Sequence, residues 1–159
     1  MTESRYNNTY NMDMTGYLTI NGVDVWTQFG AFLAETSPEE HSNMDALLRM
    51  PKAKEVTTVD FREQHGVSIP QSPDVKLDKI ERTLRFWLSA DSNVECLYRY
   101  YGLYALLVSG VLTLKLKDFR DFKLLYRDMP ADPEFVTAAD GSRCGVLFSV
   151  KFLDYAPLK

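Results

Sequence analysis

Apolar and polar residues alternate along two stretches of the chain, 80–89 and 112–117, and a helical pattern separates the two. In each stretch every second side chain is placed to face the same side, which is the period of a half-buried strand. Asp91 and Ser92 interrupt the alternation, and apolar residues then recur at helical spacing until Gly110. The pattern predicts a strand, a helix over 91–109 and a second strand.

Further short elements are predicted on both sides of this run. They are strands at Gly16–Ile20, Val56–Phe61, Phe122–Tyr126, Glu134–Thr137 and Cys144–Leu153, an extended segment from Val23 through Val25 to Leu33, and a short helix at Met44–Met50. Alternating strands imply antiparallel sheets with one packed face, and the connection through the long helix is long enough for a crossover. The predicted fold is mainly β with one principal helix (α+β), as an antiparallel β-sandwich or a partly open barrel flanked by that helix.

The 159 residues are enough for one domain with a single core. Residues 1–15 are polar and rich in Asn, with no apolar period, so we expect a flexible N-terminal arm followed by one domain over 16–159. Residues 62–78 contain Gly66, Pro70 and Pro73 and predict a long loop.

The bulk composition excludes several classes of protein. The formal net charge of −4 shows no basic stripe, so nucleic-acid recognition is not expected. No apolar run approaches the length of a membrane span, and no secretory signal is visible at the N-terminus. Cys96 and Cys144 are expected to be reduced thiols, with a disulfide between them as the alternative.

No set of residues predicts catalysis. His41 and His65 each follow glutamates but lack the spacing of a metal motif, and a zinc site needs at least three converging ligands. Cys144 could be drawn as a nucleophile, but it opens a predicted strand and is better interpreted as a packed residue. Phosphate-binding, dinucleotide-binding and serine-hydrolase motifs are all missing from the sequence. We therefore expect no enzyme, no metal and no cofactor.

The predicted helix is apolar around much of its circumference. Tyr98, Tyr101 and Tyr104 share one stripe with Leu97 and Ala105, whereas another side carries Tyr100, Leu103 and Leu107. Such a helix is buried on more than one side, which in a small domain indicates contact with another subunit. Trp87 also faces away from the apolar side of its strand. The candidate subunit interface is therefore formed by Trp87, Tyr100, Leu103 and Leu107.

The order of these elements resembles the ring-forming domain of the bacteriophage distal tail proteins. The resemblance covers most of residues 16–157 and depends on six segments: Leu18–Asp24 with its Asn-Gly turn, Phe29–Leu33, Arg82–Leu88 before the helix, Leu112–Leu116, Phe122–Tyr126 and Val146–Phe152. It implies a tail-tube-like fold and a homo-oligomeric, hexameric ring in a phage or prophage virion tail.

Such a protein would be made in the bacterial cytoplasm and would contact other tail or baseplate proteins. Because the sequence ends soon after its final strand, we expect it to lack the C-terminal carbohydrate-binding or host-adhesion module that the longer members carry. The alternative hypothesis is a small β-sandwich carbohydrate-binding module, in which exposed aromatic rings stack on a sugar.

Overall fold

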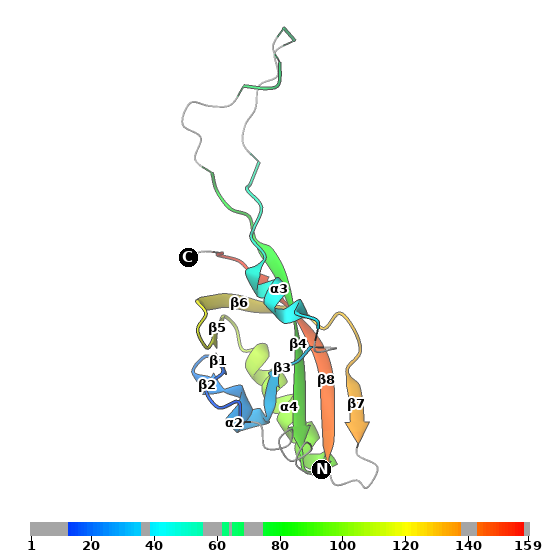
Figure 1. The fold of residues 1–159 in the computed structure, drawn as a ribbon. Coiled ribbons are helices and arrows are strands. Elements are labelled where there is room, and N and C mark those ends of the chain that lie inside the picture. Colours follow the sequence, from blue (N-terminus) through cyan, green and yellow to red (C-terminus); the bar gives the residue numbers. More distant parts are fainter. Residues whose placement is uncertain are drawn as a thin grey trace.

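Eight strands form one antiparallel sheet in the computed structural model, which describes residues 13–35, 39–55, 62–63, 65–68, 75–137 and 143–157 (Figure 1). The strand order is β2-β1-β5-β6-β8-β4-β3, with β7 paired to β8 off this path. The strands are β1 (Leu18–Ile20), β2 (Val23–Asp24), β3 (Ala31–Leu33), β4 (Ile80–Ala90), β5 (Leu112–Leu116), β6 (Asp121–Asp128), β7 (Glu134–Thr137) and β8 (Cys144–Asp154). The helices are α2 (Val25–Phe29), α3 (Ser42–Leu48) and α4 (Asn93–Leu107). The prediction of a mainly β protein with one principal helix is confirmed.

The predicted run of strand, helix and strand forms the centre of the fold as β4, α4 and β5. The alternation in β4 buries Leu84, Phe86 and Leu88 completely, as the period of two requires. β8 and β6 lie between β4 and β5 in the sheet, so the connection through α4 is not a hairpin, but it joins two strands that run in opposite directions rather than the parallel strands of a crossover. Ser92 caps the helix by accepting a hydrogen bond from the amide of Glu95, which explains why α4 begins at residue 93 rather than at the predicted residue 91.

β8 lies in the middle of the sheet and uses both of its edges. Along one edge it pairs with β4 over its whole length, from Cys144 opposite Ala90 to Asp154 opposite Ile80. Its other edge is divided, because residues 144–147 pair with β7 and residues 151–154 pair with β6. The sheet therefore branches at β8.

α2 closes most of the gap between the two ends of the sheet. The extended conformation predicted for residues 25–29 is wrong, because these residues form this helix. The Asp24 carboxylate caps the helix at the amide of Trp26, and Gly30 ends it in the left-handed conformation, with φ of 63°. A helix of 5 residues is only about 7–8 Å long, so the terminal strands β2 and β3 lie close together. The arrangement is a single curved, open sheet rather than the two packed sheets of the predicted β-sandwich.

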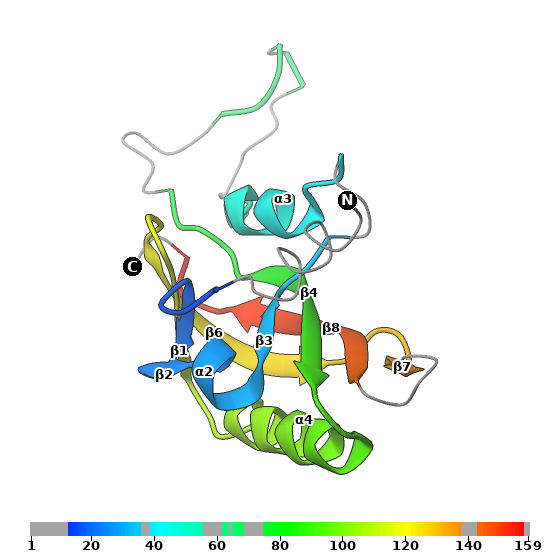
Figure 2. The same ribbon diagram turned by 60° about the horizontal axis from the view of Figure 1, so that its bottom comes forward.

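α3 and α4 lie at opposite ends of the curved sheet (Figure 2). α3 corresponds to the predicted helix at Met44–Met50 but begins two residues earlier, because the Glu35 carboxylate accepts hydrogen bonds from the amides of Ser42 and Asn43. Residues 1–12 of the predicted arm and the predicted strand at Val56–Phe61 lie outside the described residues. Among the residues that are described, no helix is long and apolar enough to cross a membrane.

The described residues between α3 and β4 extend away from the sheet (Figure 1). Two extended segments, 50–55 and 75–79, form the base of this projection. We call these two segments the arm base; they are separate from the predicted N-terminal arm. A β-bridge joins Ala53 to Leu77, and the amide of Lys54 donates to the carbonyl of Lys76 at 2.7 Å. The arm base therefore forms an antiparallel ribbon outside the body of the domain.

Candidate assembly surface

One side of α4 packs against the core side of the sheet. Cys96, Leu103 and Leu107 are fully buried there. Tyr100 contacts the ring of Phe148 on β8 edge-on, with ring centroids 5.3 Å apart and planes at 87°. An edge-on aromatic pair adds to the stabilisation that burial alone provides. This side fixes the orientation of the whole helix.

The opposite side of α4 is exposed to solvent and carries no charged side chain. The helix has two charged residues, Glu95 and Arg99, and they form an ion pair at 2.7 Å. Arg99 also donates to the carbonyl of Ser89 at 2.8 Å, which holds it beside the sheet. We call the exposed apolar side chains the outer face of α4: Val94 (80% exposed), Leu97 (44%), Tyr98 (80%), Tyr101 (65%), Tyr104 (40%) and Val108 (46%).

The structure places the four predicted interface residues in three different settings. Leu103 and Leu107 have no exposed area for a second chain to cover, so they belong to the core of one chain. Tyr100 is half-buried, and its hydroxyl contacts the Met129 sulfur at 3.4 Å. Trp87 is half-buried on the other face of the sheet. The uncharged surface is therefore the tyrosine stripe of the helix, not the side with the leucines.

Trp87 lies flat over the neighbouring strand at Gly145, where a Cβ atom would overlap the carbons of its six-membered ring. Phe32 is opposite Trp87 in the ladder and contacts Trp26, with planes tilted by 59°. Rings tilted in this way do not offer a sugar one flat stacking platform. The tyrosines of α4 are on a separate element, so the aromatic residues do not form the single strip expected of the carbohydrate-binding alternative.

A polar groove of about 500 Å³ lies between α3 and the outer face of β4 and β8. Its lining contains no aromatic side chain and consists of Ser42, Asn43, Asp45, Ala46, Arg49, Glu81, Thr83, Arg85 and Ser149. The groove therefore lacks the stacking surface that sugar-binding sites use.

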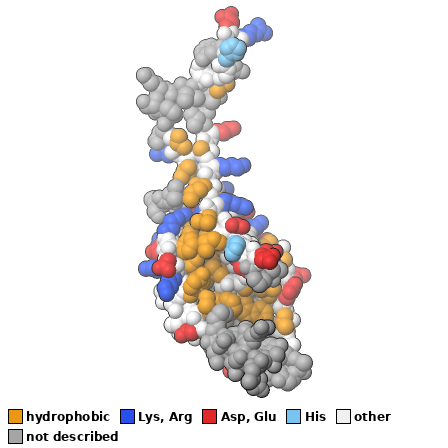
Figure 3. Space-filling view, viewed as in Figure 1, with side chains coloured by type: hydrophobic (Ala, Val, Ile, Leu, Met, Phe, Trp, Pro, Cys, Tyr) orange, Lys and Arg blue, Asp and Glu red, His pale blue; other side chains and the backbone are white. Residues whose placement is uncertain are grey.

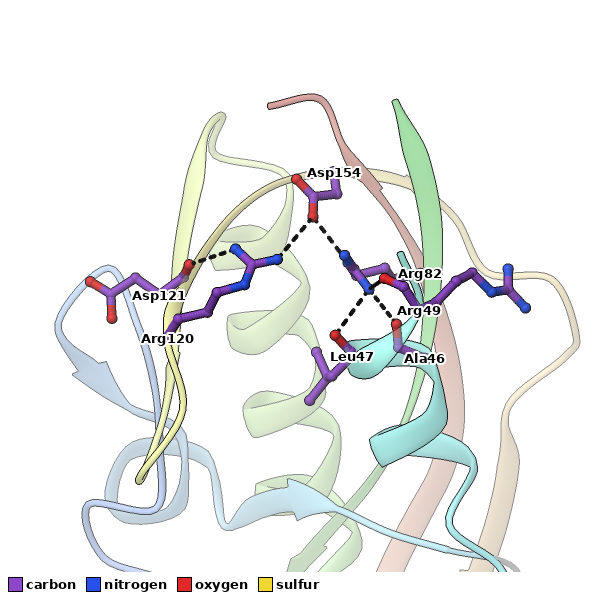
Figure 4. A network of polar contacts seen from close by, with 7 residues as sticks. All are labelled: Ala46, Leu47, Arg49, Arg82, Arg120, Asp121 and Asp154. Carbon is purple, nitrogen blue, oxygen red and sulfur yellow. Dashed lines mark hydrogen bonds and ion pairs between the residues drawn. The ribbon is translucent and has the colours of Figure 1, made fainter. Parts of the chain in front are cut away.

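A buried arginine, ion-paired within the sheet, also holds the end of α3 (Figure 4). The Arg82 Nε donates to the Asp154 carboxylate at 3.0 Å, and both side chains are almost completely buried. The Nη1 atom of Arg82 also donates to the carbonyls of Ala46, Leu47 and Arg49 at the end of α3. The guanidinium therefore satisfies carbonyls that a helix end leaves without partners.

The sequence places Arg82 on the apolar side of its strand, but this network is not among the predictions. An arginine at a core position of a half-buried strand is the signal, because a buried charge needs a partner. The partner, Asp154, is 72 residues away and cannot be identified from spacing. Arg120 lies over the ring of Phe122 and 4.0 Å from the same carboxylate, which completes the network.

The residues considered for catalysis do not converge. His41 and His65 are exposed, and no group of three or more His, Cys, Asp or Glu residues in the described part of the chain is placed to hold a metal ion. Cys96 and Cys144 are free and buried, and the Cys144 thiol donates to the carbonyl of Ser92 at 3.1 Å. Burial, with the hydrogen bond and charge of Cys144, raises the pKa of Cys96 to about 12. A thiol that stays protonated in this way is a poor nucleophile.

Comparisons with known proteins give matches among solved structures but none by sequence. No protein-family model matches the chain, and no curated protein matches it. The structure resembles the distal tail protein Dit of phage SPP1. The match has a TM-score of 0.47 and 13% sequence identity, and it covers 85% of this chain. It covers 48% of Dit, so the chain spans about half the length of that protein. Dit is described as a paradigm of the hub of the adsorption apparatus in phages that infect Gram-positive bacteria.

Proposed function

We propose that this protein is a structural, non-catalytic component of a phage or prophage tail that acts by assembling with copies of itself. The observation that carries the proposal is the uncharged outer face of α4. An apolar surface of this size is about the largest that a monomeric protein ordinarily exposes, and such a surface often marks a contact with another protein. The assembling unit is the single domain over residues 16–159.

The outer face of α4 provides a large part of an ordinary subunit contact. Three tyrosines and three aliphatic side chains at these exposures offer an area on the order of 500 Å². A specific interface buries about 800 Å² on each partner. A neighbouring copy that covers this face therefore needs further contacts from other elements. Trp87 and Tyr100, which are half-buried, are available to contribute to them.

The tail setting is supported by the order of elements in the sequence, which resembles the ring domain of distal tail proteins. A ring requires a contact between two different surfaces whose rotation closes on itself. We propose a hexameric ring in the virion tail, next to tube and baseplate proteins. The protein would be made in the cytoplasm of the bacterial host.

The test is the mass of the protein in solution, measured by light scattering over a range of concentrations. We expect the wild type to form closed rings and Tyr98→Glu/Tyr101→Glu to remain monomeric, because two buried carboxylates would be unpaired in the contact. Tyr155→Glu is the control, since Tyr155 is also exposed (43%) but follows β8 and lies outside α4. A wild type that stays monomeric at high concentration would contradict the proposal.

A further inference from the structure

β7 is a strand that this chain leaves uncovered. All four of its residues are exposed, including Phe135 and Val136, each 48% exposed. Neighbouring residues of a strand point to opposite faces, so both faces of β7 carry an exposed apolar side chain. β7 pairs only with β8, which leaves its outer edge without a strand partner among the described residues. Such edges are templates for an added strand.

The charges within β7 and the loop that leads into it are all negative, although Arg127 precedes this stretch and Lys151 is opposite Asp128 in the ladder of β6 and β8. Residues 128–137, which we call the β7 segment, contain Asp128, Asp132 and Glu134 and no Lys or Arg. All three carboxylates are exposed, and within the described residues none forms an ion pair. A strand that pairs here therefore needs apolar side chains together with positive charge.

The arm base has both of these properties. Its exposed apolar residues are Met50 (63%), Val75 (57%) and Leu77 (37%). It carries four lysines, Lys52, Lys54, Lys76 and Lys79, against the two carboxylates of Glu55 and Asp78. Asp78 already accepts a hydrogen bond from the amide of Lys79 at 2.8 Å. Figure 3 shows the basic side chains along the projection, although the whole protein has a net charge of −4.

We infer that the arm base of one copy adds as a ribbon to the outer edge of β7 in a second copy. The contact completes the backbone hydrogen bonding of β7, covers apolar side chains on both partners and places lysines beside the three carboxylates. The arm base projects from the end of the sheet near α3, whereas β7 lies along its side (Figure 1). The contact therefore joins two different surfaces, as a ring requires. This inference rests on the proposed self-assembly and assigns surfaces to it beyond α4.

Two charge-reversed variants test the two surfaces of the contact one at a time. Lys52→Glu/Lys54→Glu changes only the arm base, and Asp132→Lys/Glu134→Lys changes only the β7 segment. All four residues are exposed, so both variants are expected to keep the wild-type circular dichroism spectrum. Lys115→Glu/Lys117→Glu, on β5 and directly after it, is the matched control, because it reverses two exposed lysines outside both surfaces.

We expect each variant alone to weaken assembly at least about tenfold, since like charges would then face each other. In a mixture of the two, every contact between unlike variants again brings opposite charges together, so the mixture should assemble with the two variants alternating although neither assembles alone. The variant with all four changes should assemble again. Assembly of the wild type should also weaken as the salt concentration rises from about 0.05 to about 0.5 M, because salt screens the attraction between exposed charges.

Three outcomes would overturn the inference. If the wild type assembles and both variants assemble equally well, the contact is wrong and self-assembly through α4 still stands. If the β5 control weakens assembly as much as the other variants, net charge rather than this contact explains the effect. If the wild type is monomeric at every concentration, both the inference and the proposed function fail.

Discussion

Arg82 joins four polar groups, from β8 and from the end of α3, through one buried guanidinium. Its guanidinium contacts the Asp154 carboxylate and three carbonyls at the end of α3. Arg82→Leu would leave that carboxylate buried with only Arg120, at 4.0 Å, as a counter-charge. Removing one partner of a buried pair costs about 3–5 kcal/mol, so we expect a loss of that size in the free energy of unfolding, measured with urea.

Arg120→Leu is the control for this prediction. Arg120 is 38% exposed and lies at the limit of ion-pair distance from Asp154, so its loss should cost less than about 1 kcal/mol. Equal effects of the two substitutions would show that the buried hydrogen bonds of Arg82 do not stabilise the fold.

At the scale of elements, the start of α3 depends on the ionised form of Glu35. Burial acts to raise the pKa of this carboxyl, but hydrogen bonds from the Ser42 side chain and from the amides of Asn43 and Ser42, with the charge of His41, lower it below its ordinary value. A lowered pKa means that the stabilisation is present above the ordinary Glu range and is lost as pH falls through the pKa of the folded state.

We therefore expect the amide resonances of Ser42 and Asn43 to shift in an acid titration with a midpoint below 4.5, the ordinary value for Glu35. In Glu35→Gln the same resonances should not follow that titration. A midpoint at or above the ordinary value in the wild type would contradict the hydrogen-bonded arrangement.

The elements differ in how far the sequence predicts them. β4, α4 and β8 follow from periodicity because each is long and has one buried face. α2 could not be predicted in this way, since its 5 residues give too few turns for a period and its ends depend on Asp24 and Gly30. In α4 the apolar pattern predicts two faces that could pack against the sheet, one with leucines and one with tyrosines. The leucine face is the buried one, because a leucine side chain is wholly apolar whereas the hydroxyl group of tyrosine can be hydrated at the surface.

At the scale of the whole molecule, the two thiols report whether the domain is folded. Cys96 and Cys144 are 0% and 4% exposed, and burial with the neighbouring Cys144 raises the pKa of Cys96 to about 12. At pH 8 the native protein should leave Ellman's reagent almost unchanged, and two thiols should react after denaturation. Rapid reaction of the native protein would contradict the burial of this pair.

The same raised pKa predicts a loss of stability in alkali. The contribution of Cys96 is fully present below 9.0, its ordinary value, and declines as pH rises toward about 12, because only the unfolded thiol then ionises readily. The urea concentration at the midpoint of unfolding should therefore fall as pH rises from 9.0 toward about 12, and it should fall less in Cys96→Ala.

The central position of β8 also affects how the protein is made. β8 follows all the strands with which it pairs, and the long ladder with β4 joins residues more than about 50 positions apart. While the chain is being synthesised, β4 and β6 each lack one neighbouring strand until β8 has left the ribosome. The nascent chain thus presents apolar strand edges that can aggregate. A subunit can add to an assembly only after its last strand is in place, so folding and assembly follow in sequence.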